Sequence, residues 1–148
     1  MLRIEAATAP SDELLEAFRR LVPQLSSSAS APGPEELAAI VASPAATILV
    51  AREDMRIVGT LTLVVFRIPT GARAWIEDVV VDEAARGRGV GEALAREAIR
   101  RAAEAGARTV DLTSRPHRVA ANRLYEKLGF RPRETNLYRL ELGESGAL

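Results

Sequence analysis

The stretch that decides the fold is VVVDEAARGRGVGEAL, residues 79–94. It opens with β-branched residues typical of a buried strand and runs into residues that favour a helix. Between them lie glycines at alternate positions, Gly87, Gly89 and Gly91. Glycine allows backbone conformations closed to other residues, and the unpaired N–H groups at a helix start favour an anion. The stretch therefore predicts a strand, a loop suited to a pyrophosphate, and a long helix.

We call residues 86–92 the glycine loop. Its sequence matches neither of two well-known phosphate-binding motifs. A nucleotide-hydrolysing P-loop needs Gly-Lys-Ser/Thr at the helix start, whereas the chain has Gly91-Glu92-Ala93. The dinucleotide-binding pattern G-x-G-x-x-G does not match the glycine spacing either. Arg86 and Arg88 add positive charge to the loop. A glycine-rich turn without a ligand is the alternative interpretation.

Outward from this stretch, periodicity and turn residues predict the remaining elements. The helix that follows the loop covers residues 89–105, and Gly106 stops it. A helix that starts at Ser11 is expected to end at Pro23. The other expected elements are strands over residues 2–7, 47–51, 57–66, 74–81, 109–113 and 136–142, and helices over 34–41 and 119–128. No repeat or linker is visible, so residues 1–148 are expected to form a single α/β domain, with a mixed sheet and helices on its faces.

Composition excludes several classes of protein. Lys plus Arg number 20 and Asp plus Glu number 20, so the chain lacks the basic excess of a nucleic-acid binder. It has no cysteine, which excludes disulfides, thiolate metal sites and cysteine nucleophiles. The only histidine is His117, so no metal is expected. We find no signal-peptide pattern and no membrane-spanning apolar run, and therefore expect a cytoplasmic protein that binds neither nucleic acid nor membrane.

Three segments in the second half of the chain resemble one family. Residues 86–91, RGRGVG, resemble the acyl-CoA signature Arg/Gln-x-x-Gly-x-Gly/Ala of the GNAT family of N-acetyltransferases. Residues 124–130, LYEKLGF, look like its Leu/Phe-Tyr-x-x-x-Gly-Phe segment, and residues 76–78, IED, are similar to the acidic strand of its glucosamine-6-phosphate and polyamine members. The resemblance implies the GNAT fold, a mostly antiparallel sheet of about six or seven strands flanked by about four helices.

The resemblance also implies acetyl-CoA as cosubstrate and gives roles to individual residues. Main-chain groups of Val79 and Val81 would pair with the pantetheine arm, and Tyr125 would protonate the departing thiolate. The family often has an asparagine seven positions before the tyrosine, where this chain has Arg118, and Asn122 is the candidate replacement one helical turn later. The main-chain N–H groups that would hold the pyrophosphate belong to Arg86, Gly87, Arg88, Gly89, Val90, Gly91 and Glu92.

An acceptor ammonium must lose a proton before it can attack, because a free amine is protonated at neutral pH. Glu77 is the candidate base and Asp78 the alternative. Successive strand residues face opposite sides, so only one of the two is expected to face the acyl centre, and a β-bulge would change which one. A structural carboxylate paired with an arginine is the competing interpretation for either.

The function that follows is direct transfer of an acetyl group from acetyl-CoA to a primary amine of a small molecule, within a ternary complex. The amine is expected to enter beside the loops at residues 26–33 and 68–73. Two alternatives stay open: acetylation of a protein N-terminus or lysine, and a non-catalytic acyl-CoA-binding module. A homodimer is expected from the family resemblance alone. The sequence does not identify the acceptor.

Overall fold

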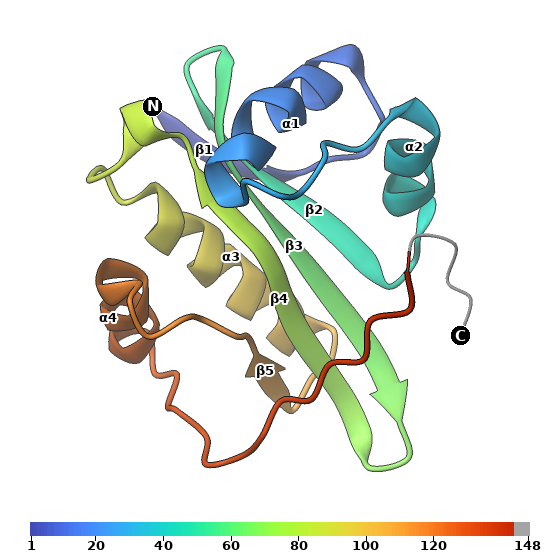
Figure 1. Cartoon of the computed structure of the whole chain (residues 1–148), viewed down its shortest axis with the longest axis vertical. Coiled ribbons are helices and arrows are strands. Elements are labelled where there is room, and N and C mark those ends of the chain that lie inside the picture. The colour runs from blue at the N-terminus through green and yellow to red at the C-terminus, as the bar shows by residue number, and fades with distance from the viewer. Residues whose placement is uncertain (144–148) are drawn as a thin grey trace. The chain divides into compact units, whose positions relative to one another are not determined.

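A computed structural model describes residues 1–143 of the chain (Figure 1). The chain forms two compact units, Met1–Thr113 and Ser114–Leu148, and each is described by itself. The first unit contains, in order, β1 (Leu2–Ala6), α1 (Asp12–Leu25), α2 (Pro34–Ala42), β2 (Ala46–Glu53), β3 (Arg56–Ile68), β4 (Gly71–Val81), a 3-10 turn (Glu83–Ala85), α3 (Val90–Glu104) and β5 (Thr109–Asp111). The second unit contains α4 (Val119–Lys127).

The sheet of the first unit has the strand order β1-β2-β3-β4-β5. Its neighbours run antiparallel except for β4 and β5, which run parallel. The expected α/β class with a mixed, mostly antiparallel sheet is therefore confirmed, although the sheet has five strands rather than six or seven.

The closing strand expected over residues 136–142 is absent, so this prediction was wrong. Residues 131–143 contain no strand, and the side chains of Leu137, Tyr138 and Leu140 are 66%, 86% and 76% exposed. A strand exists only where its main-chain groups pair with another strand, and no described strand pairs with this segment. Alternating apolar residues favour a strand, but a strand also needs a neighbouring strand to pair with, and this segment has none within residues 1–143.

The end of α1 also differs from the prediction, because the helix continues past Pro23 to Leu25. Proline removes one N–H from the helix and its ring crowds the carbonyl four residues earlier, but here it lies in the last turn, where few hydrogen bonds follow. The turn closes beyond it, where the N–H of Ser26 donates to the carbonyl of Val22 at 3.0 Å. At the other end, the Ser11 hydroxyl accepts from the N–H of Leu14, as expected of an N-cap.

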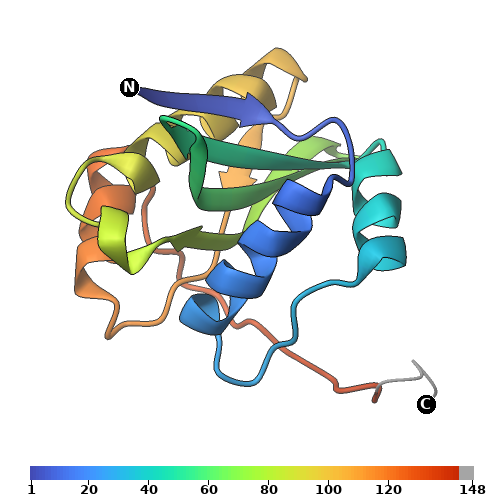
Figure 2. The same ribbon diagram turned by 90° about the horizontal axis from the view of Figure 1, so that it is seen from above.

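Helices cover both faces of the sheet, with α1 and α2 on one side and α3 on the other (Figure 2). The core on the α1 side consists of Leu14, Leu15, Ala17, Leu21, Leu37, Ile48, Val50, Ile57 and Val80. On the α3 side the helix packs closely on β3 at Gly59. A Cβ there would lie 3.1 Å from Cγ1 of Val90 and 3.2 Å from Cδ1 of Leu94. The glycine thus allows the start of α3 to lie directly on the sheet, which fixes the end of the glycine loop.

Candidate active site

A β-bulge interrupts β4 next to the predicted acidic residues. Thr60 pairs with Val80, but Thr62 pairs with Glu77, so two residues of β4 lie opposite one residue of β3. One of the two, Asp78, has a φ of 49°, a left-handed conformation that few non-glycine residues adopt. A bulge bends its strand and redirects the following side chains. A β-bulge was the feature expected to change which of Glu77 and Asp78 faces the acyl centre, and β4 contains one at this position.

Beyond its first half, β4 separates from β5. The parallel pairing covers three residues of each strand, Arg73–Trp75 of β4 with Thr109–Asp111 of β5. From Ile76 to Val81, no strand among residues 1–143 pairs with β4 on the β5 side. This part of the strand contains the predicted pantetheine residues Val79 and Val81, both half-buried. An extended ligand can pair with such an edge as an added strand would.

The glycine loop presents main-chain donors that the described chain does not use. None of residues 1–143 accepts a hydrogen bond from the N–H groups of Gly87 through Gly91. Gly87 and Gly89 have φ of 79° and 78°, and a Cβ built on either would meet no atom within 4 Å. Gly89 is the N-cap of α3, a helix of 15 residues. N–H donors at the start of a helix, next to glycines that let a ligand come close to the main chain, suit the oxygens of a diphosphate.

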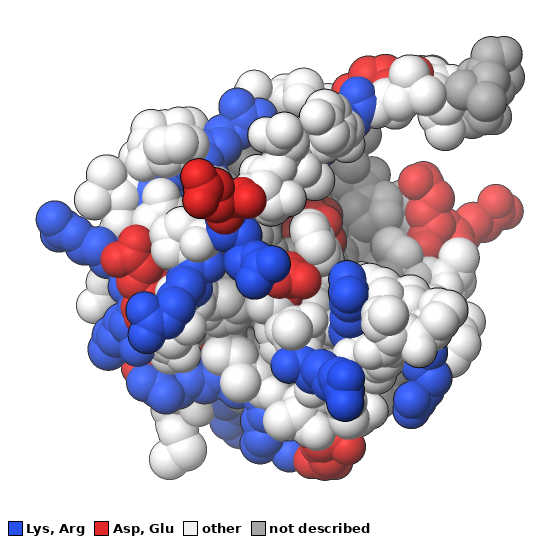
Figure 3. Space-filling view, turned by 90° about the horizontal axis from the view of Figure 1, so that it is seen from below, with Lys and Arg blue, Asp and Glu red and all other residues white. Residues whose placement is uncertain are grey.

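The arginines of the loop differ from each other in their partners. The Arg88 guanidinium lies 2.7 Å from the Glu53 carboxylate and donates to the Ala84 carbonyl at 3.1 Å. The Arg86 guanidinium lies 4.0 Å from the Glu83 carboxylate, with 57% of its side chain exposed. Arg88 therefore braces the loop against the end of β2. Acidic side chains also lie among Lys and Arg side chains elsewhere on the surface, as one face shows (Figure 3).

The acidic pair on β4 is asymmetric. Nε1 of Trp75 donates to Oε1 of Glu77 at 2.6 Å. The two residues are separated by one position on the strand, so they share a face. The Asp78 carboxylate has no hydrogen-bond or ion-pair partner within residues 1–143. The pairing of Trp75 with Glu77 was missed in the sequence, although the two-residue spacing was visible.

The second unit holds the remaining candidates on α4. The Tyr125 ring meets the Phe130 ring edge-on, with centroids 5.8 Å apart. Burial raises the pKa of the Tyr125 hydroxyl above its ordinary value, and the charge of Arg118 opposes this. The Tyr125 hydroxyl is therefore protonated at neutral pH and able to donate. Nδ2 of Asn122 donates to the Arg115 carbonyl at 3.0 Å, which uses part of the amide proposed to contact the cosubstrate.

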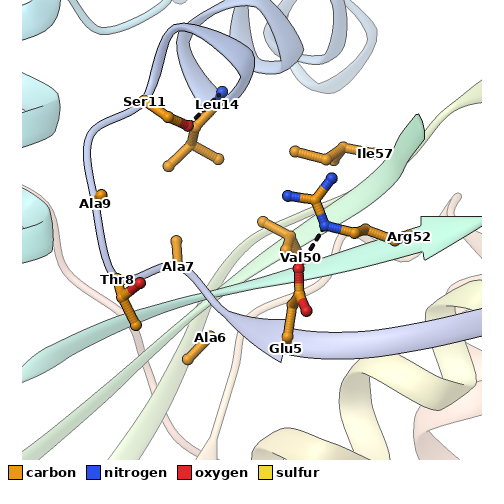
Figure 4. A pocket seen from close by; sticks show the side chains of 10 residues that line it. All are labelled: Glu5, Ala6, Ala7, Thr8, Ala9, Ser11, Leu14, Val50, Arg52 and Ile57. Carbon is orange, nitrogen blue, oxygen red and sulfur yellow. Dashed lines mark hydrogen bonds and ion pairs between the residues drawn. The ribbon is translucent and has the colours of Figure 1, made fainter. Parts of the chain in front are cut away.

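A separate cavity of about 140 Å³ lies where β1 ends and α1 begins (Figure 4). The Arg52 guanidinium points into it and bonds to the Glu5 carboxylate, and also to both Glu13 oxygens at 2.7 and 2.8 Å. The hydrogen bonds to the two carboxylates hold the pKa of Arg52 far above its ordinary range. This ion-pair network joins α1 to the sheet, and no local pattern in the sequence predicts it.

Residues 1–143 contain no helix with the length and apolar character needed to cross a membrane. Within the same residues, no group of three or more His, Asp or Glu is arranged to hold a metal ion.

A bulged strand, a glycine loop and an open helix start thus lie next to one another in an α/β fold, and main-chain N–H groups at a helix start are suited to an anion. The model of the acetyltransferase (GNAT) family matches residues 12–130. The chain therefore belongs to the GNAT acetyltransferases, and the resemblance seen in the sequence is confirmed.

Solved structures share this fold. A protein described as an acetyltransferase from Agrobacterium tumefaciens str. C58 is 34% identical, with a TM-score of 0.82 over 94% of this chain and 99% of its own. A transcriptional regulator from Bacillus halodurans C-125 is 28% identical, with a TM-score of 0.83 over 95% and 100%. Glucosamine-6-phosphate N-acetyltransferase from Arabidopsis thaliana, 22% identical, shares the fold, with a TM-score of 0.79 over 95% and 98%. The chain matches no curated protein.

Proposed function

We propose that the protein transfers an acetyl group from acetyl-CoA to a primary amine of a small molecule, by direct transfer in a ternary complex. The observation that carries the proposal is the row of unused N–H groups from Gly87 to Gly91 at the open start of α3. These donors fit the diphosphate of coenzyme A, and the unpaired edge of β4 fits its extended pantetheine arm.

The residues divide the chemistry between them. Glu77, oriented by Trp75, accepts the proton that the acceptor ammonium must lose, directly or through a water molecule. The amine nitrogen then forms a bond to the thioester carbonyl carbon, and the carbon–sulfur bond breaks. Tyr125 gives its proton to the departing sulfur, and the second proton that the acetylated nitrogen must lose passes to the Tyr125 oxygen, directly or through water, which restores the phenol. Much of the rate comes from holding the amine and the thioester together.

We propose that residues 1–148 act as one catalytic domain, and the family match supports this because residues 12–130 include most of the first unit and, in the second, helix α4. The acceptor class rests on the acidic pair Glu77 and Asp78, suited to an ammonium group. Glucosamine-6-phosphate N-acetyltransferase, which acts on a small molecule, has the same fold. A cytoplasmic location and a homodimer stay predictions.

Two variants test the loop in a matched way. Gly89 and Gly106 both have positive φ, 78° and 85°, and both have open space where a Cβ would lie. Alanine in this conformation costs about 1 kcal/mol or more, so each variant should lose similar stability. Gly89→Ala should also weaken acetyl-CoA binding about tenfold, because the strained loop moves its donors, whereas Gly106→Ala should bind normally.

Isothermal calorimetry with acetyl-CoA measures both variants and the unchanged protein. The proposed function is overturned if the unchanged protein gives no heat of binding. If Gly89→Ala binds acetyl-CoA as tightly as the unchanged protein, the glycine loop does not bind the cosubstrate. Thiol release from acetyl-CoA, measured with mixed amines and with peptides, then separates the alternatives. A binding module releases no thiol, and a protein acetyltransferase responds to the peptides rather than to small amines.

A further inference from the structure

A buried carboxylate lies between β4 and the glycine loop, and the mechanism above does not use it. Asp82 follows β4 directly and is only 6% exposed. Its N–H donates to the Val58 carbonyl at 2.8 Å, which holds it to the sheet. Its Oδ1 accepts from the N–H of Ala84 at 3.1 Å, and its Oδ2 accepts from Nη1 of Arg20. Both oxygens thus accept hydrogen bonds, one from the 3-10 turn before the glycine loop and one from α1.

Helix α1 supports this carboxylate from two successive turns. Nη2 of Arg20 donates to the Ile57 carbonyl at 2.8 Å, so the guanidinium joins β3 to Asp82. One turn later, Oε1 of Gln24 accepts from the N–H of Glu83 at 2.8 Å, and its Nε2 donates to the Arg20 carbonyl at 3.3 Å. We refer to Asp82, Arg20 and Gln24 as the Asp82 cluster.

The hydrogen bonds divide residues 83–91 into two halves, the turn at residues 83–86 and the donor residues 87–91 of the glycine loop. The N–H groups of Glu83 and Ala84 are used by the cluster, and those of Ala85 and Arg86 donate to the carbonyls of Asp82 and Glu83. The unused donors begin at the next residue, Gly87. Every N–H of the first half is thus used, two by the Asp82 cluster and two within the turn, whereas no described residue accepts from the N–H groups of the second half. The direction of the second half depends on how firmly the first is held.

Charge explains why an arginine supports this carboxylate. A lone anion at the base of the loop would repel a bound diphosphate, and Arg20 balances it, with Arg56 also 3.5 Å from Oδ2. Burial acts to raise the pKa of Asp82, but the hydrogen bond from Ala84 and the charge of Arg20 outweigh burial and hold the pKa below its ordinary value. The carboxylate is therefore ionised, paired and fixed in place.

We propose that Asp82, held by Arg20 and Gln24, is a positioning residue that keeps the N–H groups of Gly87 to Gly91 directed at the diphosphate of acetyl-CoA. The inference rests on the proposed function and adds α1 to the parts of the chain that determine cosubstrate affinity. The Asp82 cluster touches neither the acyl group nor the acceptor in this scheme. Its loss should therefore act on binding of the cosubstrate and not on turnover at saturation.

The test uses graded changes at Asp82 and one change at Gln24. Asp82→Ala removes both acceptors and should raise the acetyl-CoA Kd and KM about tenfold or more, with kcat at saturation within about twofold. Asp82→Asn keeps an oxygen for the N–H of Ala84 and should recover part of the loss. Gln24→Met removes only the acceptor for Glu83 and should raise Kd several-fold, about threefold to fivefold, in a well-folded protein.

The control is Arg52→Met, which breaks the ion pairs from Arg52 to Glu5 and Glu13. These also join α1 to the sheet but do not touch the loop. It should lower the melting temperature and leave acetyl-CoA binding unchanged. Calorimetry, steady-state kinetics and thermal unfolding are measured on every variant.

Three outcomes decide the matter. Normal acetyl-CoA binding in both Asp82→Ala and Gln24→Met overturns the positioning role while leaving the proposed function intact. Equal weakening of binding by Arg52→Met also overturns it, because general loosening of α1 would then explain the effect. Failure of the unchanged protein to bind acetyl-CoA overturns the proposed function, and the positioning role with it.

Discussion

Replacing Tyr125 with phenylalanine should lower turnover by about 10²-fold to 10⁴-fold and leave acetyl-CoA affinity unchanged. The substitution removes one oxygen and keeps the ring that meets Phe130 edge-on, so packing is retained. Without the hydroxyl, the departing thiolate has no positioned proton donor. Thiol release at saturating acetyl-CoA and amine gives kcat, and calorimetry gives the affinity.

The control for this variant is Tyr138→Phe, since Tyr125 and Tyr138 are the two tyrosines of the chain. Tyr138 is 86% exposed, and its hydroxyl accepts from Nδ2 of Asn136 at 3.3 Å. Its kcat should match that of the unchanged protein. An undiminished kcat in Tyr125→Phe would remove Tyr125 from the mechanism.

The same hydroxyl predicts a pH dependence. Burial raises the pKa of Tyr125, so the group stays protonated until the pH passes the ordinary tyrosine value of about 10. Turnover of the unchanged protein should therefore show no loss from this group near neutral pH and should fall only on the far alkaline side. Tyr125→Phe should lack that fall, which pH profiles of kcat would show.

Glu77→Gln should lower turnover by a comparable factor, about 10²-fold to 10⁴-fold, while Asp78→Asn should have little effect. Glutamine keeps the length and one oxygen that can accept from Nε1 of Trp75, so the geometry of the pair is preserved. It cannot accept the proton of the acceptor ammonium. Initial rates with a small primary amine, at saturating acetyl-CoA, measure the loss for both variants.

The comparison of the two variants assigns the base. A large loss in Asp78→Asn with normal turnover in Glu77→Gln would transfer the role to Asp78, whose left-handed backbone places it in the bulge. Equal and small effects in both would mean that neither carboxylate removes the proton. Acetyl-CoA binding should stay normal in each, since neither carboxylate belongs to the glycine loop.

The features that the sequence predicted correctly are local ones. The helix from residue 90 and the glycine loop before it depend on neighbouring residues, so apolar spacing and glycine positions were sufficient. The contact between Arg20 and Asp82 joins positions 62 residues apart, and nothing in either segment signals the other. The closing strand failed for the same reason: alternation predicts a strand, but its partner is a distant segment.

The sequence indicated what a β-bulge in β4 would change, but not that the strand contains one. A bulge is a mismatch in register between two strands, and register depends on both strands at once. The sequence of residues 76–79 therefore placed two carboxylates in the strand, but it could not show which face of the sheet each side chain would occupy. The brace between Arg88 and Glu53 likewise required the end of β2 to lie next to the loop, which only the folded sheet provides.

The separation of β4 from β5 has a practical consequence for handling the protein. Main-chain groups of β4 beyond Trp75 pair with no described strand on that side, and exposed strand edges promote association between molecules. A cosubstrate that pairs along this edge would shield it. Preparations kept with coenzyme A should accordingly tolerate higher concentration and longer storage than preparations without it.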